Sequence, residues 1–167
     1  MRPLDLPVLL KIIALKGKEW RNIDLAVSLK ISASEISESL NRCKIAGLID
    51  LKKRKVNRLA LQEFLIYGLK YVFPVVPGPM VRGIPTAHSG SPINKKMMAG
   101  NDMYVWPYAK GEQRGQAIEP LYKTLPEIVL EDQLFYELMV IADTLRVGRA
   151  REIKIAKQEL EKRLINE

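Results

Sequence analysis

The sequence predicts a mainly α-helical protein of the α+β class, with helices in its first 71 residues, a small β-hairpin and two C-terminal helices. Three observations predict this arrangement. Apolar residues recur at helical spacing through most of residues 5–71 and again through 125–165. Five prolines and four glycines interrupt residues 74–100, which excludes a long regular element there. Two short runs, 103–108 and 116–122, flank a turn and predict paired strands.

Composition limits the class of protein. The chain has 167 residues, 27 of them Lys or Arg and 19 Asp or Glu, and a formal net charge of +8. A single cysteine excludes an internal disulfide and a cysteine-based zinc site. No apolar run approaches the roughly 20 residues of a membrane span, and the N-terminal stretch does not resemble a secretion signal. We therefore expect a cytoplasmic protein without membrane contact.

The positive charge is concentrated in the first half. Residues 1–73 carry 14 basic and 7 acidic side chains, whereas residues 74–167 carry 13 and 12. Such a distribution is typical of nucleic-acid binding, although charge alone is equally compatible with an ordinary soluble domain. We predict a basic domain at 1–73, a Pro/Gly-rich strap at 74–102, and a unit at 103–167 that contains the hairpin and the last helices and is a candidate dimerisation or partner-binding region.

The first two predicted helices are short. Residues 5–16 have a broad apolar face, with Asp5 as the expected cap and Gly17 at the end. The apolar residues between 23 and 29 predict a second helix, capped by Asn22.

The third helix has a clear start and end. Ser32 and Glu35 have the spacing of a capping box. Three apolar side chains at i, i+4 and i+7 then mark its buried stripe: Ile36, Leu40 and Cys43. Gly47 suits the left-handed conformation that commonly ends a helix.

Further elements follow the basic run 52–55. A helix is predicted over 57–71, so any β-wing between it and the third helix is short or absent. Its expected core positions are Leu59, Leu61, Phe64, Leu65 and Leu69. Thr124 and Glu127 form a second candidate capping box, which predicts a helix to about residue 145, and the last helix is expected at 149–165.

The three helices within 5–51 fit a helix-turn-helix, in which a polar-faced helix enters the major groove of DNA. Small or hydrogen-bonding side chains on its outward face would read base edges, and cations beside it would contact phosphates. The predicted base-reading residues are Ser34, Ser37, Glu38 and Asn41, with Ser32 at the start of the helix. The predicted phosphate contacts are Arg21, Asn22, Arg42, Lys44, Lys52, Lys53, Arg54 and Lys55. The alternative is an ordinary helical bundle with a polar surface.

Residues 23–51 resemble the helix-turn-helix of MarR-like winged-helix transcriptional regulators. The matching positions are Leu25-Ala26, Leu29, Ile31-Ser32, Ser34, Ile36-Ser37, Leu40, Arg42 and Gly47-Leu48-Ile49. The resemblance covers the N-terminal part of the chain only. It implies a homodimer that binds a palindromic operator, usually as a repressor, with its third helix in the major groove.

Enzymatic functions lack support in the sequence, and we predict neither a metal nor a cofactor. The only histidine, His88, lies in the Pro/Gly-rich stretch, where a surface-loop role is expected. Cys43 is expected to be a small buried side chain, the alternative being a redox switch. No phosphate loop, metal-binding histidine pair or dinucleotide fingerprint occurs.

The sequence therefore predicts a sequence-specific double-stranded DNA-binding transcriptional regulator in the cytoplasm, associated with the nucleoid and acting as a homodimeric repressor. The last two helices are the expected source of dimer contacts. The competing hypothesis is an antitoxin-like or adaptor protein, in which residues 74–167 bind a partner protein while the N-terminal half autoregulates its operon. RNA binding is the weaker third hypothesis, because no aromatic platform accompanies the basic residues.

Overall fold

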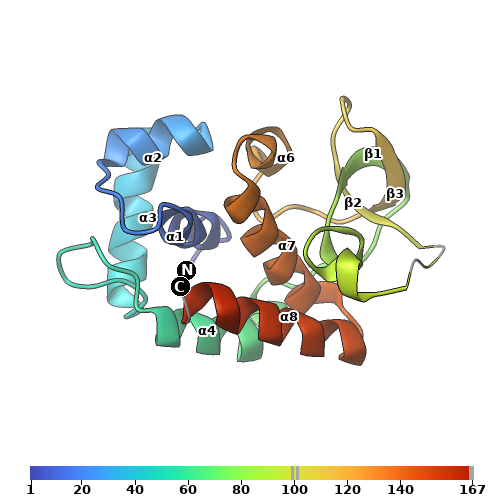
Figure 1. Ribbon diagram of the computed structural model, residues 1–167. Coiled ribbons are helices and arrows are strands. Elements are labelled where there is room, and N and C mark those ends of the chain that lie inside the picture. Colours follow the sequence, from blue (N-terminus) through green and yellow to red (C-terminus); the bar gives the residue numbers. More distant parts are fainter. Residues whose placement is uncertain (99, 101, 166–167) are drawn as a thin grey trace.

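The computed structural model describes residues 1–98, 100 and 102–165, and it is a mixed α/β structure in which helices predominate (Figure 1). The helices are α1 (Asp5–Ala14), α2 (Asn22–Leu29), α3 (Ala33–Ile45), α4 (Arg58–Tyr67), α5 (Leu69–Val72), α6 (Leu125–Ile128), α7 (Gln133–Val147) and α8 (Ala150–Leu164). The strands are β1 (Met80–Pro85), β2 (Tyr104–Pro107) and β3 (Gln113–Ala117). None of the helices in the described part of the chain combines the length and the apolar character needed to cross a membrane.

The two ends of the molecule differ in structure. In Figure 1, α2, α3 and the loop that follows α3 lie at one end, and the three strands lie at the other. Between them, α1 packs against both α3 and α7.

The helices predicted at the N-terminus are present, but two of their predicted caps are wrong. Asp5 lies inside α1 after the N-cap Leu4, and its carboxylate is buried. Arg21 occupies the N-cap of α2, and Asn22 is its first helical residue.

Helix α3 begins and ends as the sequence predicts. The Ser32 hydroxyl accepts a hydrogen bond from the backbone N–H of Glu35 at 3.1 Å, and the Glu35 carboxylate accepts one from the Ser32 backbone at 3.3 Å. At the other end Gly47 has φ +72°, which allows the Leu48 N–H to donate to the Cys43 carbonyl at 2.9 Å. This geometry turns the chain sharply into the next segment.

A short hairpin-like loop follows α3. Its only ladder pairing in the structure is an isolated antiparallel bridge between Ile49 and Val56, supported by the Asn57 N–H donating to the Leu48 carbonyl at 2.8 Å. We call residues 50–55, which this bridge closes, the basic loop. The prediction that any wing here is short or absent is compatible with this single bridge.

The helix predicted over 57–71 is broken in two at Gly68, between α4 and α5. Asn57 caps α4 by accepting a hydrogen bond from the Ala60 N–H at 3.2 Å. Three of the predicted core positions are buried: Leu61, Leu65 and Leu69. Phe64 is only partly buried, and Leu59 is 64% exposed because α4 buries one narrow stripe against α7 and α8, so Leu59 was wrongly predicted as a core residue.

The strands do not form the predicted hairpin. Strand β1, which comes from the Pro/Gly-rich stretch, pairs antiparallel with both β2 and β3, while β2 and β3 run parallel to each other and close a small barrel. The prediction failed because β1 takes up the main-chain hydrogen bonds that a hairpin would have used. Gly83 and Gly111 permit this crossing, since a Cβ on Gly83 would clash with the Trp106 carbonyl and one on Gly111 with Gly83.

The predicted long helix from Thr124 to about residue 145 is also two helices, joined by the 3-10 turn Val129–Glu131. Thr124 occupies the N-cap position of α6 but makes no side-chain cap bond, and its hydroxyl donates to the Leu29 carbonyl at 2.8 Å. Helix α7 is instead capped by Asp132, which accepts from the Phe135 N–H at 3.0 Å. The last helix, α8, matches its predicted range closely.

Helix α7 lies at the centre of one apolar core that runs through both halves of the chain. Nine of its 15 residues are buried. Among them, Asp143 is fully buried and accepts hydrogen bonds from the Trp106 indole at 2.6 Å and the Thr86 hydroxyl at 2.9 Å. Burial raises the pKa of Asp143, against the opposing effect of Arg146, which pairs with it at 2.8 Å. Asp143 thus attaches Trp106 on β2, and Thr86 just after β1, to α7.

Candidate nucleic-acid interface

Helix α3 has one buried and one outward side. The buried residues are Ile36, Ser39, Leu40 and Cys43. The exposed residues are Ala33, Ser34, Glu35, Glu38, Asn41 and Ile45. Ser37 and Lys44 are half-buried and lie at the edge of the outward side. The structure therefore brings the predicted base-reading residues of α3 together on one surface, and it adds the apolar Ile45, which is 85% exposed.

The basic loop lies beside this surface and is bonded to it. The Lys53 ammonium donates a hydrogen bond to the side-chain oxygen of Asn41. Asp50 shapes the loop from inside, since its carboxylate accepts from the backbone N–H groups of Arg54 at 2.6 Å and Lys55 at 3.0 Å. These hydrogen bonds hold the pKa of Asp50 below its usual range. The side chains of Lys52, Arg54 and Lys55 are left exposed to solvent.

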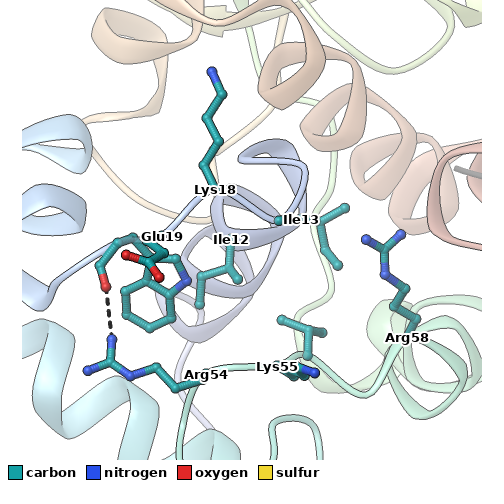
Figure 2. Close-up of a pocket in the computed structure, with 10 residues that line it drawn as sticks. Ile12, Ile13, Lys18, Glu19, Arg54, Lys55 and Arg58 are labelled. Carbon is teal, nitrogen blue, oxygen red and sulfur yellow. Dashed lines mark hydrogen bonds between the residues drawn. The ribbon is translucent and has the colours of Figure 1, made fainter.

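Arg54 connects the basic loop to the segment between α1 and α2. Its guanidinium donates to the Trp20 carbonyl at 2.9 Å and lies 5.0 Å from the centroid of the Trp20 ring (Figure 2). This contact is a hydrogen bond and a cation–π interaction at once. Arg54 is thus directed toward Trp20.

Arg42 occupies a different position from the one expected for a phosphate contact. Its guanidinium binds the fully buried carboxylate of Asp5, with Nε 3.0 Å from Oδ2 and Nη2 2.8 Å from Oδ1. The hydrogen bond with Asp5 raises the pKa of Arg42. The exposed Glu38 carboxylate is farther away, at 3.9 Å. This pairing argues for a structural role of Arg42 and against a contact with DNA.

The remaining predicted residues lie at helix starts. Arg21 is exposed and pairs with Asp24 at 3.0 Å, and hydrogen bonds from Arg21 lower the pKa of Asp24. Asn22 is half-buried at the first position of α2. The Ser32 hydroxyl is engaged in the cap of α3. The Arg21 side chain is 78% exposed despite its ion pair with Asp24.

The turn between α2 and α3 is attached to the second half of the chain. Lys30 ends α2 in the left-handed conformation, with φ +52°, and its ammonium pairs with the Glu127 carboxylate on α6. The nearby Leu29 carbonyl accepts the Thr124 hydroxyl. Two polar contacts therefore set the orientation of this turn relative to α6.

Other reactive groups do not assemble into a second centre. Within residues 1–98, 100 and 102–165, no group of three or more His, Cys, Asp or Glu side chains has the arrangement of a metal site. His88, expected on a surface loop, is half-buried in a 3-10 turn, with Nε2 2.5 Å from the Asp102 carbonyl and its ring against Tyr104 at 4.5 Å. Its other ring nitrogen, Nδ1, lies 4.0 Å from the Glu152 carboxylate.

Sequence reasoning missed Ile45 and Trp20 as members of this region. Ile45 could have been found from its helical position, because it follows Ile36 by nine residues and so points to the opposite side of α3. Trp20 carried no such signal, since its partner Arg54 is 34 residues away.

Comparisons with protein-family models, with curated proteins and with solved structures find no match to this chain. The function must therefore be inferred from the geometry of the interface itself.

Proposed function

We propose that the chain binds double-stranded DNA sequence-specifically as a winged helix-turn-helix regulator of transcription, and that it acts as a repressor. One observation carries this proposal: the polar outward side of α3 lies beside the basic loop, so potential base-reading and phosphate-binding groups share one surface. The end of the molecule that carries this surface is opposite the strands (Figure 1), which leaves room for a duplex.

The outward side of α3 suits the major groove, which is about 12 Å wide and admits one helix. Ser34 and Ser37 are small, so the first turns of α3 can approach the bases closely. Asn41 can hydrogen-bond adenine and Glu38 can accept from cytosine. Ile45 adds an apolar group of the kind that contacts the thymine methyl. Each well-formed base contact contributes about 1–3 kcal/mol of discrimination.

The cations around α3 supply the sequence-independent part of binding. Those proposed to contact phosphates are Arg21, Lys44, Lys52, Lys53, Arg54 and Lys55. Arg42 is left out of this set because Asp5 holds its guanidinium. Lys53 has a second role in the free protein, since its bond to the Asn41 oxygen orients the Asn41 amide.

The proposed homodimer would use α8 rather than α7. Helix α7 is largely enclosed by the rest of the chain, so it has little surface to offer a second copy. Helix α8 buries one stripe and presents its opposite face to solvent, next to α4. A symmetric dimer doubles the base contacts that one short helix can make. Light scattering that finds a strict monomer at micromolar concentration would exclude this part of the proposal.

The direct test is selection of binding sites from random duplex DNA, followed by fluorescence anisotropy at low and moderate salt. We expect a palindromic consensus with higher affinity than scrambled duplexes and a strong salt dependence. Failure to bind any duplex at low ionic strength would refute the proposal. If the protein bound no duplex but co-purified stably with another protein, the adaptor function would be favoured, in which residues 74–167 bind that partner.

A further inference from the structure

The antiparallel pair of β1 and β3 places two arginines directly opposite each other. In its register, Arg82 on β1 is the partner of Arg114 on β3. Residues that face each other across an antiparallel pair project to the same side of the sheet, with their Cβ atoms about 4.5–5.5 Å apart. Both side chains are exposed. The two guanidinium groups therefore extend from neighbouring points on one surface of the barrel.

Neither arginine is neutralised by the residues around it. In the described part of the chain, the Arg82 and Arg114 guanidinium groups make no ion pair and no hydrogen bond. The acidic residue nearest to Arg114 in the sequence, Glu112, is exposed and also makes no ion pair to a described residue. Like charges directly opposite in a sheet destabilise it. A bound anion would offset this repulsion.

The charge of the surrounding segment also favours an anion. Residues 78–118, which contain the three strands, carry five Lys or Arg and two Asp or Glu, whereas residues 119–167 carry eight and ten. The second half of the chain is thus divided into a basic strand region and a slightly acidic helical region. The strands therefore present a positive potential of their own, at the end of the molecule opposite α3 (Figure 1).

The form of this surface favours a phosphate backbone over a peptide. Because the three strands close into a barrel, none of them offers an unpaired edge to which an extended peptide could add. Met80 is the one exposed apolar side chain of β1 and β3, whereas a protein–protein interface usually has an apolar centre. The donors of a guanidinium group form a planar fork that matches the oxygens of a phosphate.

We propose that Arg82 and Arg114 bind the phosphate backbone of a second DNA duplex, so that one protein joins two duplexes. Each guanidinium group donates charge-assisted hydrogen bonds to phosphate oxygens and reads no base sequence. A second duplex is assigned to the strands because the arginine pair and α3 lie at opposite ends of the molecule (Figure 1). The joining of two duplexes rests on the proposed function, whereas phosphate binding at the strands does not.

The site is tested by titrating the isotope-labelled full chain with a short duplex of random sequence at low salt. NMR then follows the backbone amide signals residue by residue. We expect saturable shifts in two separate regions of the chain. One is α3 with the basic loop, and the other is the paired part of β1 and β3, at residues 80–83 and 113–116.

Variants connect the second set of shifts with the arginine pair. In Arg82→Gln with Arg114→Gln, the strand shifts should be lost, while the remaining shifts in α3 show that the protein is folded. The matched control, Lys18→Gln with Lys123→Gln, removes two exposed cations outside the strands and should keep both sets of shifts. Glu112→Gln removes a negative charge beside the pair and should tighten binding at the strands by about twofold or more.

The joining of two duplexes is measured with a selected binding-site duplex fixed on beads and a labelled duplex of random sequence in solution. The wild type should retain the labelled duplex on the beads. The Arg82/Arg114 double variant should retain at least about tenfold less, with unchanged affinity for the fixed duplex, because it lacks only the second set of phosphate contacts. The Lys18/Lys123 control should retain as much as the wild type.

Absence of shifts in the strands, or equal strand shifts in the arginine double variant, would overturn the phosphate site. Strand shifts with a polyglutamate peptide but not with the duplex would assign this surface to an acidic protein and overturn the DNA assignment. Full retention of the labelled duplex by the double variant would overturn the joining alone. Shifts in the strands with none in α3 would refute the proposed function and leave the phosphate site standing.

Discussion

The carboxylate of Asp5 at the start of α1 accepts hydrogen bonds from the Arg42 guanidinium on α3, at 3.0 Å from Nε and 2.8 Å from Nη2. The same carboxylate accepts the Ser39 hydroxyl at 2.7 Å and the Arg2 backbone N–H at 2.7 Å. These hydrogen bonds to a buried carboxylate fix the orientation of α3 against α1. The direction in which the outward side of α3 faces is therefore set by this polar contact as well as by apolar packing.

Replacing Asp5 should destabilise the protein strongly. Asp5→Ala leaves the fully buried Ser39 hydroxyl and the partly buried Arg42 guanidinium without their acceptor, and we expect a loss of about 3–5 kcal/mol in the free energy of unfolding. Urea denaturation measures it. Glu38→Ala is the matched control, because the Glu38 carboxylate lies 3.9 Å from the Arg42 guanidinium but its side chain is 62% exposed. This variant should lose less than about 1 kcal/mol in the free energy of unfolding. Equal losses in the two variants would contradict the role assigned to Asp5.

The elements that local sequence determines were predicted well. Helix α3 was predicted with its capping box, its buried stripe and its terminal Gly47, because each of these depends on residues within one or two helical turns. Helix α8 followed equally from its apolar periodicity. For the candidate interface, the outward positions of Ser34, Glu38 and Asn41 followed from the same helical geometry.

The features that depend on distant residues were not predicted. Strand β1 lies in a Pro/Gly-rich stretch, and its paired residues in β2 and β3 are at least 20 and 30 positions away respectively, which no local pattern encodes. Asp5 was predicted as a helix cap because its partner Arg42 is 37 residues away. Arg42 was for the same reason predicted to face phosphates. Long-range polar pairing, rather than helix propensity, thus accounts for the errors in the site.

Cys43 should react slowly with thiol reagents in the folded protein. It is fully buried on α3, and burial raises the pKa of its thiol to about 12, so little of the nucleophilic thiolate exists near pH 8. With an aromatic disulfide reagent at pH 8, we expect negligible labelling of the native chain and labelling of one thiol after unfolding in guanidinium chloride. Fast labelling without denaturant would support the redox-switch alternative for this residue.

Glu159 should contribute to stability in a pH-dependent way. Burial alone would raise its pKa, but hydrogen bonds from Lys96, Arg163 and Lys162 outweigh burial and lower the pKa to about 2. Because the folded pKa lies below the ordinary value of 4.5, the stabilisation is present above about pH 4.5 and is lost as the pH falls through about 2.

The test compares the wild type with Glu159→Gln by urea denaturation between pH 7 and pH 2. The stability advantage of the wild type should shrink by up to about 3 kcal/mol as the pH falls from about 4.5 to about 2. Glu161→Gln, on the exposed side of the same helix, is the control and should show no such trend. An advantage for Glu159 that does not change with pH would indicate packing and not charge.

Neutralising the basic loop should weaken binding to every duplex alike. In Lys52→Gln with Lys53→Gln, each lost phosphate contact should reduce the slope of log affinity against log salt by roughly one unit. Lys95→Gln with Lys110→Gln removes the same charge elsewhere and should leave the slope unchanged. Anisotropy titrations at several salt concentrations measure these slopes, and equal effects in the two double variants would show that net charge alone governs binding.

Removing the Asn41 side chain should instead affect one position of the operator. Asn41→Ala deletes an amide on the outward side of α3, and we expect a loss of about 1–3 kcal/mol on the selected site with little change on unrelated duplexes. Because Lys53 is bonded to Asn41 in the free protein, Lys53→Met is measured in parallel. Lys53→Met should weaken binding to all duplexes. This result distinguishes an effect of the basic loop from a loss of base recognition. Asn94→Ala, at an exposed asparagine outside the interface, should bind as the parent does. If Asn41→Ala lowered affinity uniformly for all sequences, Asn41 would be a backbone contact and the orientation of α3 in the groove would need revision.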